Sequence, residues 1–567
     1  MREYKKYAWL GLLCIGVEVV LEITVPLLMA DLIDYGVTNA DGTYIIKKGL
    51  QMALCAVLAL ILGVGSAKFS ALAGQGLGAN IRKAEYEKLQ SYSFSNIDHF
   101  SVSSLVTRLT SDVTNIQNAV STGMRPFGRS PVMLIFASSF AFRINSTLAL
   151  VFLVALPTLA VLLILIIINV GPLYGRMQSA IDQVNRCIQE NLTAIRVVKS
   201  YVRGDYEVEK FGVVNENLKS ESEKAFGTAV LNMPAMQFVM YGTILGILLI
   251  GGRLINEGQM MIGQLTSFLS YVLLILNSLM MMSNVFLLMT RSLASAERIM
   301  EVIDEKIDIT DENAKDIAVA KGEIEFDHVW FKYKDTAKEY VLSDVSFHIK
   351  PGQTVGIIGQ TGSSKTTLVQ LIPRLYDVTK GEVKIDGINV KEYPVRHLRD
   401  AVAMVLQKNT LFSGSLIDNL RWGNENATLD EIKEACQIAC VDEFVDRLAD
   451  GYDTGMGQEG VNVSGGQKQR ICIARAILKK PKVLILDDST SAVDTATEAK
   501  IRSGLAEKLP DMTKIIIAQR ISSVRHADQI IIMDRGHVEA IGTHESLLRD
   551  NQIYQEIYAS QKEGADL

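Results

Sequence analysis

The sequence predicts two structural classes joined in one chain: an α-helical domain of membrane-spanning helices, followed by an α/β domain with a parallel sheet. Three observations support this prediction. Apolar runs of the length that a bilayer requires recur through residues 1–300. Residues 483–486 form a short, wholly apolar and β-prone run, which is typical of a buried parallel strand. That run ends on Asp487 and Asp488, at the edge where ligands sit in open α/β sheets.

The composition agrees with a membrane half joined to a soluble half. The 567 residues are too many for one core, and 21% of them are charged. The mean hydropathy of +0.20 is high for a soluble protein. The 57 basic and 63 acidic residues give a net charge of −6, which argues against nucleic-acid binding. The six cysteines show no paired framework, so we expect reduced thiols.

Six apolar runs are suited to crossing a bilayer, which needs about 20 such residues per helix. The first run follows Arg2, Lys5 and Lys6, and the positive-inside bias places this end in the cytoplasm. The third is interrupted by Arg129, but residues 143–145 look like a tight hairpin into the fourth. The six runs are residues 8–30, 49–67, 126–142, 146–170, 227–251 and 261–289.

Two long polar segments, residues 76–125 and 174–224, separate these runs and are rich in helix-forming residues. Folded as helical hairpins, each would extend about 37 Å from the membrane at 1.5 Å per residue. We expect their tips near residues 95–102 and 200–207. From the residues alone these tips are solvated turns.

Two carboxylates and a methionine-rich stretch occur inside the expected spans. Glu18 and Glu22 lie one turn apart on the first helix. Intramembrane carboxylates indicate a cavity or pathway, or else an ion pair with a basic residue such as Arg125 or Arg129. Met281 belongs to a methionine cluster that would suit an adaptable substrate surface or plain packing.

The character of the chain changes after residue 300. Residues 1–300 form the expected transmembrane domain, the charged residues 301–321 a linker, and residues 322–567 the α/β domain. In that domain the strand-like residues 354–358 lead into a glycine-rich loop and an apolar helix. Such a loop cradles phosphates with its backbone amides, while a lysine reaches the β/γ oxygens and a hydroxyl binds Mg²⁺. The loop residues are Gly359, Gln360, Thr361, Gly362, Ser363, Ser364, Lys365, Thr366 and Thr367.

A second anion site is predicted about twenty residues before Asp487. Ser464, Gly465, Gly466 and Gln467 open a helical segment, and amides freed at a helix N-terminus bind anions. Together with the apolar strand and its aspartates, this stretch resembles the signature motif and Walker B strand of ATP-binding cassette (ABC) ATPases. The resemblance covers essentially the whole chain, and the two polar hairpins resemble those of type IV ABC exporters, whose tips are coupling helices.

The resemblance implies a role for each matching residue, with ATP and Mg²⁺ as cofactors. Tyr333 matches the aromatic that stacks on adenine, and Gln407 matches the Q-loop glutamine that links Mg²⁺ and the hydrolytic water to the coupling helices. Asp487 matches the aspartate that coordinates Mg²⁺ with Thr366. The D-loop residues are Ser491 and Asp494.

Three residues depart from the family's pattern. Ser364 stands where glycine normally precedes the lysine, and Asp488 stands where the family has a catalytic glutamate. Gln519 replaces the switch histidine, and glutamine cannot carry an imidazolium's charge. These residues would make the chain's own ATP site catalytically impaired beside an intact signature.

This pattern resembles the degenerate-site subunit of a heterodimeric bacterial multidrug exporter. The resemblance implies a multi-pass plasma-membrane protein in the lipid bilayer, with its nucleotide-binding domain in the cytoplasm. Its partner would be a second, non-identical half-transporter and its substrate a small amphiphile. A homodimeric lipid or peptide exporter, in which Asp488 itself catalyses slow hydrolysis, is an alternative. So is an ATP-gated regulatory membrane protein.

Overall fold

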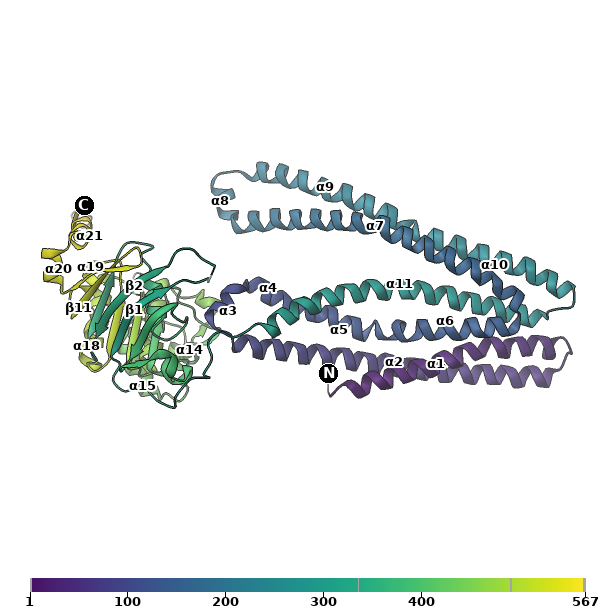
Figure 1. The fold of residues 1–567 in the computed structure, drawn as a ribbon, viewed down its shortest axis with the longest axis horizontal. Coiled ribbons are helices and arrows are strands. Elements are labelled where there is room, and N and C mark those ends of the chain that lie inside the picture. Colours follow the sequence, from purple (N-terminus) through teal and green to yellow (C-terminus); the bar gives the residue numbers. More distant parts are fainter. Residues whose placement is uncertain (1–2, 335, 490–491, 564–567) are drawn as a thin grey trace. The chain divides into compact units, whose positions relative to one another are not determined.

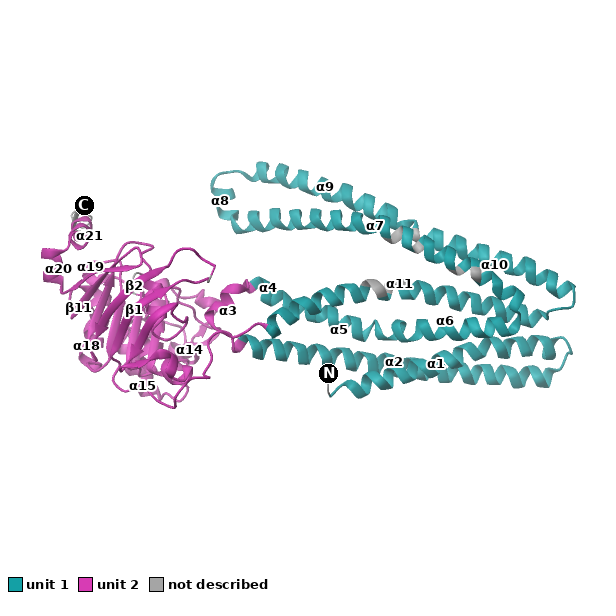
Figure 2. Cartoon of the chain, in the orientation of Figure 1, with its two compact units in different colours: residues 1–89, 103–304 teal, residues 90–102, 305–567 magenta. Residues whose placement is uncertain are grey.

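The computed structural model describes residues 3–334, 336–489 and 492–563 (Figure 1). The chain divides into two compact units: residues 1–89 with 103–304, and residues 90–102 with 305–567 (Figure 2). The first unit is helical and the second is α/β, as the sequence predicts. Residues 90–102, which belong to the first predicted hairpin, lie in the α/β unit.

The helical unit consists of long helices that run past one another (Figure 1). Asn145 alone separates α6 from α7 and caps α7 by accepting a hydrogen bond from the Leu148 amide at 3.0 Å, so the predicted hairpin is confirmed. The elements are α1 (Lys5–Asp31), η1 (Leu32–Val37), α2 (Gly42–Gln90), α4 (Val102–Thr107), η2 (Arg108–Asp112), α5 (Val113–Ser121), α6 (Met124–Ile144), α7 (Ser146–Thr193), α8 (Ile195–Ser200), α9 (Gly204–Val230), α10 (Asn232–Asn256) and α11 (Ile262–Asp304).

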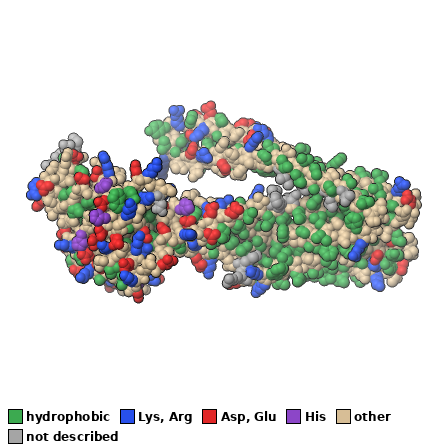
Figure 3. All heavy atoms as spheres, viewed as in Figure 1, with side chains coloured by type: hydrophobic (Ala, Val, Ile, Leu, Met, Phe, Trp, Pro, Cys, Tyr) green, Lys and Arg blue, Asp and Glu red, His purple; other side chains and the backbone are tan. Residues whose placement is uncertain are grey.

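Among the described residues, four helical stretches are long and apolar enough to cross a membrane. Hydrophobic side chains accordingly cover most of the middle of this unit on the face in Figure 3. The predicted third run lies in α6 and the fourth in α7, where residues 146–162 form a shorter apolar stretch. The number of six spans stays a prediction. The four stretches are Lys5–Val37, Gly42–Gln90, Gly204–Asn256 and Ile262–Met282.

The second polar hairpin is formed by α7 and α9, with the short α8 at its tip (Figure 1). The short helix begins before the predicted range 200–207 and shares only Ser200 with it, which is a correction, whereas the turn between α8 and α9 lies inside that range. The returning helix α9 already begins at Gly204, because Val202 takes a left-handed φ of 54° and closes the turn. The linker boundary also shifts, since α11 continues through Asp304 before the chain becomes irregular.

The α/β unit contains two sheets. The larger has the strand order β12-β11-β3-β10-β9-β6, in which β11, β3, β10, β9 and β6 run parallel and β12 pairs antiparallel with β11. The smaller is antiparallel in the order β2-β1-β4-β5, and β7 pairs with β8. The strands are β1 (Ile324–Phe331), β2 (Leu342–Ile349), β3 (Thr354–Ile358), β4 (Lys380–Ile385), β5 (Ile388–Asn389), β6 (Val402–Val405), β7 (Gly414–Ser415), β8 (Gly455–Met456), β9 (Val483–Asp487), β10 (Thr513–Ile517), β11 (Gln529–Asp534) and β12 (His537–Gly542).

Strand β9 is buried on both faces, which explains its uninterrupted apolar sequence. Val483 and Ile485 pack into the core shared with the smaller sheet, whereas Leu484 and Leu486 face the helices on the other side. The helices of this unit are α3 (Phe94–His99), α12 (Lys365–Gln370), η3 (Val390–Glu392), α13 (Val395–Ala401), α14 (Leu416–Arg421), α15 (Leu429–Ile438), α16 (Asp442–Val445), η4 (Gly451–Asp453), η5 (Gln458–Gly460), α17 (Gly465–Leu478), α18 (Thr495–Lys508), α19 (Ile521–Val524), α20 (His544–Asp550) and α21 (Gln552–Glu563).

The tip of the first hairpin is the short helix α3, which begins one residue before the predicted range 95–102 and otherwise lies inside it. Ser93 caps α3 and also donates to Asp308, and Asn96 donates to the Lys306 carbonyl at 2.8 Å. On the domain side, the Tyr376 hydroxyl donates to Asp98 at 2.7 Å. These bonds fix α3 to the α/β unit.

Candidate nucleotide-binding site

The phosphate loop connects β3 to α12, as predicted. The Lys365 ammonium donates to the carbonyls of Gly359 and Gln360 at 2.8 Å each. Gly359 has no room for a side chain, since a Cβ there would lie 2.2 Å from the Met533 carbonyl oxygen. The first N–H groups of α12 have no partner within the helix, so the loop offers backbone donors and a cation to phosphate oxygens.

Ser364 has a left-handed backbone, with φ at 70° and ψ at 23°. This conformation costs a residue with a Cβ roughly 1–2 kcal/mol of free energy, whereas glycine adopts it freely. The departure from glycine at this position therefore places backbone strain in the phosphate loop, directly before Lys365.

The Thr366 hydroxyl donates to Asp487 Oδ1 at 3.0 Å, which brings together two of the three predicted Mg²⁺ ligands; the third, Gln407, hydrogen-bonds the adjacent Asp488. Asp487 is 1% exposed, and its Oδ2 has no hydrogen-bond partner among the residues described. The pKa of Asp487 is raised above its usual value, mainly by burial. The Thr366 hydrogen bond opposes this rise, and the neighbouring Asp488 adds to it. An orphaned buried oxygen beside a hydroxyl fits a hard divalent cation, which prefers oxygen ligands.

Asp488 follows at the end of β9 and contacts two glutamines. Gln519 Nε2 donates to Asp488 Oδ2 at 2.9 Å, and the Gln407 side chain also hydrogen-bonds this carboxylate. The pKa of Asp488 is raised above its usual value because burial outweighs the hydrogen bonds from Gln519 and Gln407, which lower it. The structure thus brings together the three residues predicted to act in hydrolysis, and the side-chain amides of Gln519 and Gln407 both contact the Asp488 carboxylate.

Tyr333 lies beside the phosphate loop, with its hydroxyl 2.8 Å from the Thr367 hydroxyl. Its ring stands edge-on to Tyr376, with ring centroids 5.2 Å apart, and Tyr333 is 45% exposed. A half-exposed aromatic ring next to the loop can stack on a planar base.

The signature residues form the N-terminus of α17 with complete capping. Gln467 N donates to Ser464 Oγ at 3.3 Å, and Ser464 N donates to Gln467 Oε1 at 2.8 Å. Ser464 and Gly465 are exposed, so their polar groups are available to a ligand from outside this chain's own loop. A Cβ at Gly466 would lie 2.7 Å from the Ala492 carbonyl oxygen, so glycine is required there.

The predicted D-loop is described only in part, because Ser491 lies outside the described residues. Asp494 caps α18, accepting a hydrogen bond from the Thr497 amide at 2.9 Å. The bonds from Thr497 lower the pKa of Asp494. In the described part of the loop, the Ala492 amide donates to Gln469 Oε1 at 3.1 Å, which ties this loop to α17.

Sequence reasoning missed Gln561 on α21. Its Nε2 donates to the Gln519 carbonyl at 2.7 Å, and its Oε1 accepts from the Ile521 amide at 2.8 Å. The two bonds bracket Arg520 and hold the backbone of the switch position. Nothing in the sequence marks this glutamine, because the contact spans 42 residues and joins it to backbone groups.

Glu18, Glu22 and Met281 are the predicted residues inside the membrane domain. Arg125 lies 2.6 Å from Glu18, and Arg129 lies 2.6 Å from Glu22, so the predicted ion pairs are present. Both glutamates also line a cavity, so the two alternatives coexist. Met281 is 45% exposed and is not among the lining residues of this cavity.

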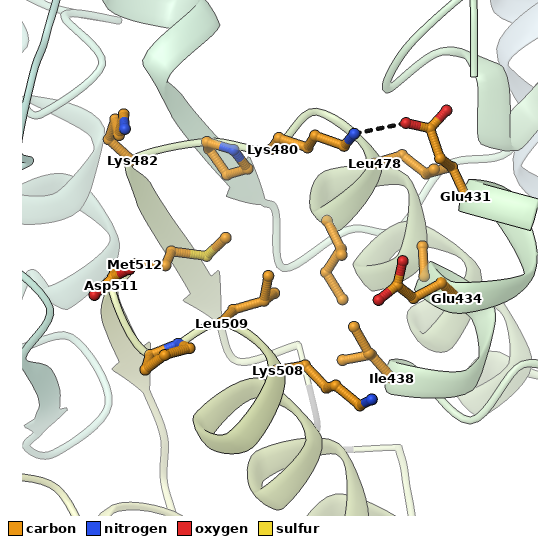
Figure 4. Close-up of a pocket in the computed structure, with 14 residues that line it drawn as sticks. Glu431, Glu434, Ile438, Leu478, Lys480, Lys482, Lys508, Leu509, Asp511 and Met512 are labelled. Carbon is orange, nitrogen blue, oxygen red and sulfur yellow. Dashed lines mark hydrogen bonds and ion pairs between the residues drawn. The ribbon is translucent and has the colours of Figure 1, made fainter. Parts of the chain in front are cut away.

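Another cavity, of about 330 Å³, opens at the amino ends of β9 and β10 (Figure 4). Its lining combines apolar side chains with equal numbers of acidic and basic ones, and Lys480 pairs with Glu431 at 2.6 Å. The nucleotide-binding loops follow the carboxyl ends of the parallel strands, so this cavity is no part of the nucleotide site. The charged lining residues are Glu431, Glu434, Asp511, Lys480, Lys482 and Lys508.

These features define a P-loop ATPase domain in a chain that also carries a membrane domain. Comparison with known proteins identifies the family. Residues 8–279 match the family described as ABC transporter transmembrane region, and residues 342–491 match the family described as ABC transporter.

Full-length relatives give the same result. YfiB of Bacillus subtilis, an uncharacterized ABC transporter ATP-binding protein, is 38% identical, covering 100% of this chain and 98% of its own length. YgaD of Bacillus subtilis, a candidate multidrug export ATP-binding/permease protein, is 31% identical over 99% and 98%. An ATP-dependent lipid A-core flippase of Pseudomonas putida is 32% identical over 98% and 94%.

The fold is that of an ABC exporter. The structure of a bacterial Atm1-family ABC exporter with ATP bound superposes with a TM-score of 0.83 at 23% identity, covering 99% of this chain and 98% of that one. The chain belongs to the ABC transporter family, as an ATP-hydrolysing, multi-pass half-transporter with one transmembrane and one ATPase domain.

Replacing Ser364 with glycine should strengthen the phosphate loop. We expect Ser364→Gly to stabilise the protein by about 1 kcal/mol, because the left-handed backbone no longer carries a Cβ, and glycine's unfolded-state entropy offsets only part of this gain. ATP affinity should rise in parallel. The measurements are thermal unfolding and ATP titration of the purified protein. Ser364→Ala is the matched control, since it removes the hydroxyl but keeps the Cβ; an equal gain in that variant would contradict the strain argument.

Proposed function

We propose that this chain is one half of a heterodimeric exporter in which its own ATP site is catalytically impaired. The observation that supports this proposal most is the triad at the carboxyl ends of three strands, where Asp488 accepts hydrogen bonds from Gln519 and Gln407. ATP binding is preserved by Lys365, Thr366 and Asp487, so the defect falls on cleavage rather than on binding.

The shortened acid is the first source of impairment. Aspartate is one methylene shorter than the family's glutamate, so its carboxylate lies about 1 Å farther from the attacking water, and misplacement of that size can cost about a hundredfold in rate. The neutral Gln519 is the second source. It occupies Asp488 Oδ2 with its amide and cannot supply the positive charge of a histidine at the γ-phosphate.

The signature motif of this chain has all of its residues, so it can contact the ATP that is bound to the partner chain. In ABC proteins two nucleotide domains dimerise head to tail, and each ATP contacts the signature of the opposite chain. Ser464 and Gly465 are exposed and capped, so they are preorganised donors for the partner's γ-phosphate. The non-identical partner would then supply a catalytic glutamate and a switch histidine.

The transported compound, in this proposal, is an amphiphilic drug or lipid. The names of two relatives, a candidate multidrug exporter and a lipid A-core flippase, support this class. Binding of ATP with Mg²⁺ would close the nucleotide domains and turn the membrane helices outward. The basic residues Lys5 and Lys6 at the start of the first span support an orientation in which the N-terminus and the ATPase domain lie on the cytoplasmic side of a bacterial plasma membrane.

A homodimeric exporter of lipid or peptide is the second candidate. One observation favours it: burial raises the pKa of Asp488, which makes this carboxylate a stronger base. Purification of the chain alone distinguishes the two assemblies. The heterodimer proposal expects weak ATPase activity for the chain alone and robust activity only when a second half-transporter is co-expressed. Robust activity of the isolated chain, at the same protein and Mg²⁺ concentrations, would support the homodimer. ATP binding without hydrolysis or transport in every assembly would indicate the ATP-gated regulatory protein instead.

The signature should matter more to turnover than Asp488 does. Ser464→Ala removes one preorganised donor to developing charge, which typically costs about 2.7–4 kcal/mol, or roughly 10²–10³ in rate, and Gly465→Asp places a negative charge where the γ-phosphate is expected. We therefore expect Ser464→Ala and Gly465→Asp to abolish most ATPase activity and dye efflux in the co-expressed pair. Asp488→Asn should keep a substantial fraction, because it removes a carboxylate that is already poorly placed.

The Gly465 variant is a clean probe, because a Cβ there meets its nearest neighbour, Ala492 Cβ, at 3.7 Å, an ordinary contact. Loss of activity with an unchanged thermal unfolding temperature would therefore reflect the nucleotide contact and not misfolding of α17. The reverse order, with Asp488→Asn dead and the signature variants active, would falsify the asymmetric assignment.

A further inference from the structure

A cavity of about 770 Å³ lies among α1, α2, α6 and α11, and we name it the four-helix pocket. Its volume falls within the range of about 300–1,000 Å³ typical of ligand pockets. One part of its lining is charged, with Glu18 and Glu22 from α1 and Arg125 from α6. Much of the rest is apolar, and α2 contributes mainly small side chains and Gly63.

The charges at the four-helix pocket compensate one another. Arg125 Nη2 donates to Glu18 Oε1 at 2.6 Å, and Arg129 approaches the same oxygen at 3.4 Å. Arg129 also forms an ion pair with Glu22 at 2.6 Å. Two carboxylates and two guanidinium groups give a net charge of zero, so the cluster needs no counter-ion.

The cluster nevertheless has unused hydrogen-bonding capacity of both kinds. Glu18 is 3% exposed, and its Oε2 is buried without a hydrogen-bond partner among the described residues. The Arg125 side chain is 41% exposed, and its bond to Glu18 uses one of the five N–H donors of a guanidinium. An acceptor and a set of donors therefore lie next to each other at the pocket.

The position of the cluster restricts the charge of a ligand. Glu18 lies at the middle of α1, which runs from Lys5 to Asp31 and belongs to a stretch apolar enough to cross a membrane. An uncompensated charge at such depth is costly. A ligand with net charge would unbalance the neutral cluster, whereas a zwitterion would leave the balance unchanged.

We propose that the four-helix pocket binds the zwitterionic headgroup of a phospholipid. The ammonium group is held by the Glu18 carboxylate, which turns its buried Oε2 toward the pocket, and the phosphate is held by the remaining donors of Arg125. This assignment rests on the proposed export function and names a ligand class for it.

The walls of the pocket account for a lipid rather than a soluble zwitterion. Leu60 and Val64 line the pocket and are 67% and 63% exposed, so acyl chains can lie along this face of α2. Gly63 leaves the charged pair uncovered. A Cβ at that position would lie 3.1 Å from Glu18 Oε1 and 3.2 Å from Arg125 Nη2.

The test measures which lipid the full-length protein retains. The protein, with its partner where the pair is the stable form, is purified in micelles containing equal amounts of phosphatidylethanolamine and phosphatidylglycerol with identical acyl chains. We expect retention of phosphatidylethanolamine to exceed that of phosphatidylglycerol by about tenfold, the effect of one charge-assisted hydrogen bond. Equal retention of the two lipids would overturn the proposal, as would displacement of the bound lipid by free phosphoethanolamine, which lacks acyl chains.

Two kinds of variant locate the binding. Ala56→Phe fills the pocket from α2 without touching the charges and should abolish the preference, whereas Ala53→Phe lies on the same helix outside the pocket lining and should leave it intact. Glu18→Gln gives the cluster one net positive charge and should shift retention toward phosphatidylglycerol. Equal effects of Ala56→Phe and Ala53→Phe, or no shift with Glu18→Gln, would contradict the assignment; if Ala56→Phe fails to fold, the Glu18→Gln shift decides.

Lipid retention tests the headgroup site, whereas ATP-driven efflux tests the proposed export function. ATP-driven dye efflux is measured with the same preparations, reconstituted in vesicles. Efflux without lipid preference would refute the headgroup site and leave the exporter intact. Lipid preference without ATP-driven efflux would keep the site and refute the proposed export.

Discussion

The parallel alignment of β3, β10, β9 and β6 is the constraint on which the nucleotide site depends. In this register Ile357 and Asp487 both pair with Ile517 across neighbouring strands, and Val405 pairs with Leu486. The four strands therefore end at one edge of the sheet. There they place the phosphate loop, Gln519, the two aspartates and Gln407 next to one another, although these residues lie far apart in the sequence.

The same alignment brings Asp488, Gln519 and the phosphate loop that contains Ser364 to one edge of the sheet. A buried carboxylate such as Asp487 is expensive unless a cation or hydrogen bonds compensate it. Thr366 supplies one bond, and Mg²⁺ with ATP would supply the rest. The hydrolytic step needs a further base and a positively charged sensor at this edge. In this chain those two positions hold an aspartate and a glutamine that bond to each other. In the proposed assignment, the residues that bind ATP are therefore distinct from the residues that limit its cleavage.

The sequence predicted the parts of the site that local patterns encode. The strand β9, the phosphate loop and the start of α17 depend on apolar runs and on glycines next to a helix start, all of which are short-range signals. It did not predict the Tyr376 bond to Asp98, because that contact spans 278 residues and joins side chains with no motif of their own. The sequence did not predict the role of Gln561 either, because its contact with Gln519 spans 42 residues and involves a backbone carbonyl. For Glu18 and Glu22 the sequence left a pathway and an ion pair as alternatives, and the structure contains both a cavity and the pairs.

The central claim is that ATP is bound but rarely cleaved at this chain's own site. The most direct measurement is the identity of the nucleotide on each chain after many turnovers. The co-expressed pair is incubated with α-labelled azido-ATP, crosslinked by light, separated into its two chains and analysed for the phosphate number of the bound nucleotide. The account predicts chiefly triphosphate on this chain and diphosphate on its partner. Chiefly diphosphate on this chain would contradict it.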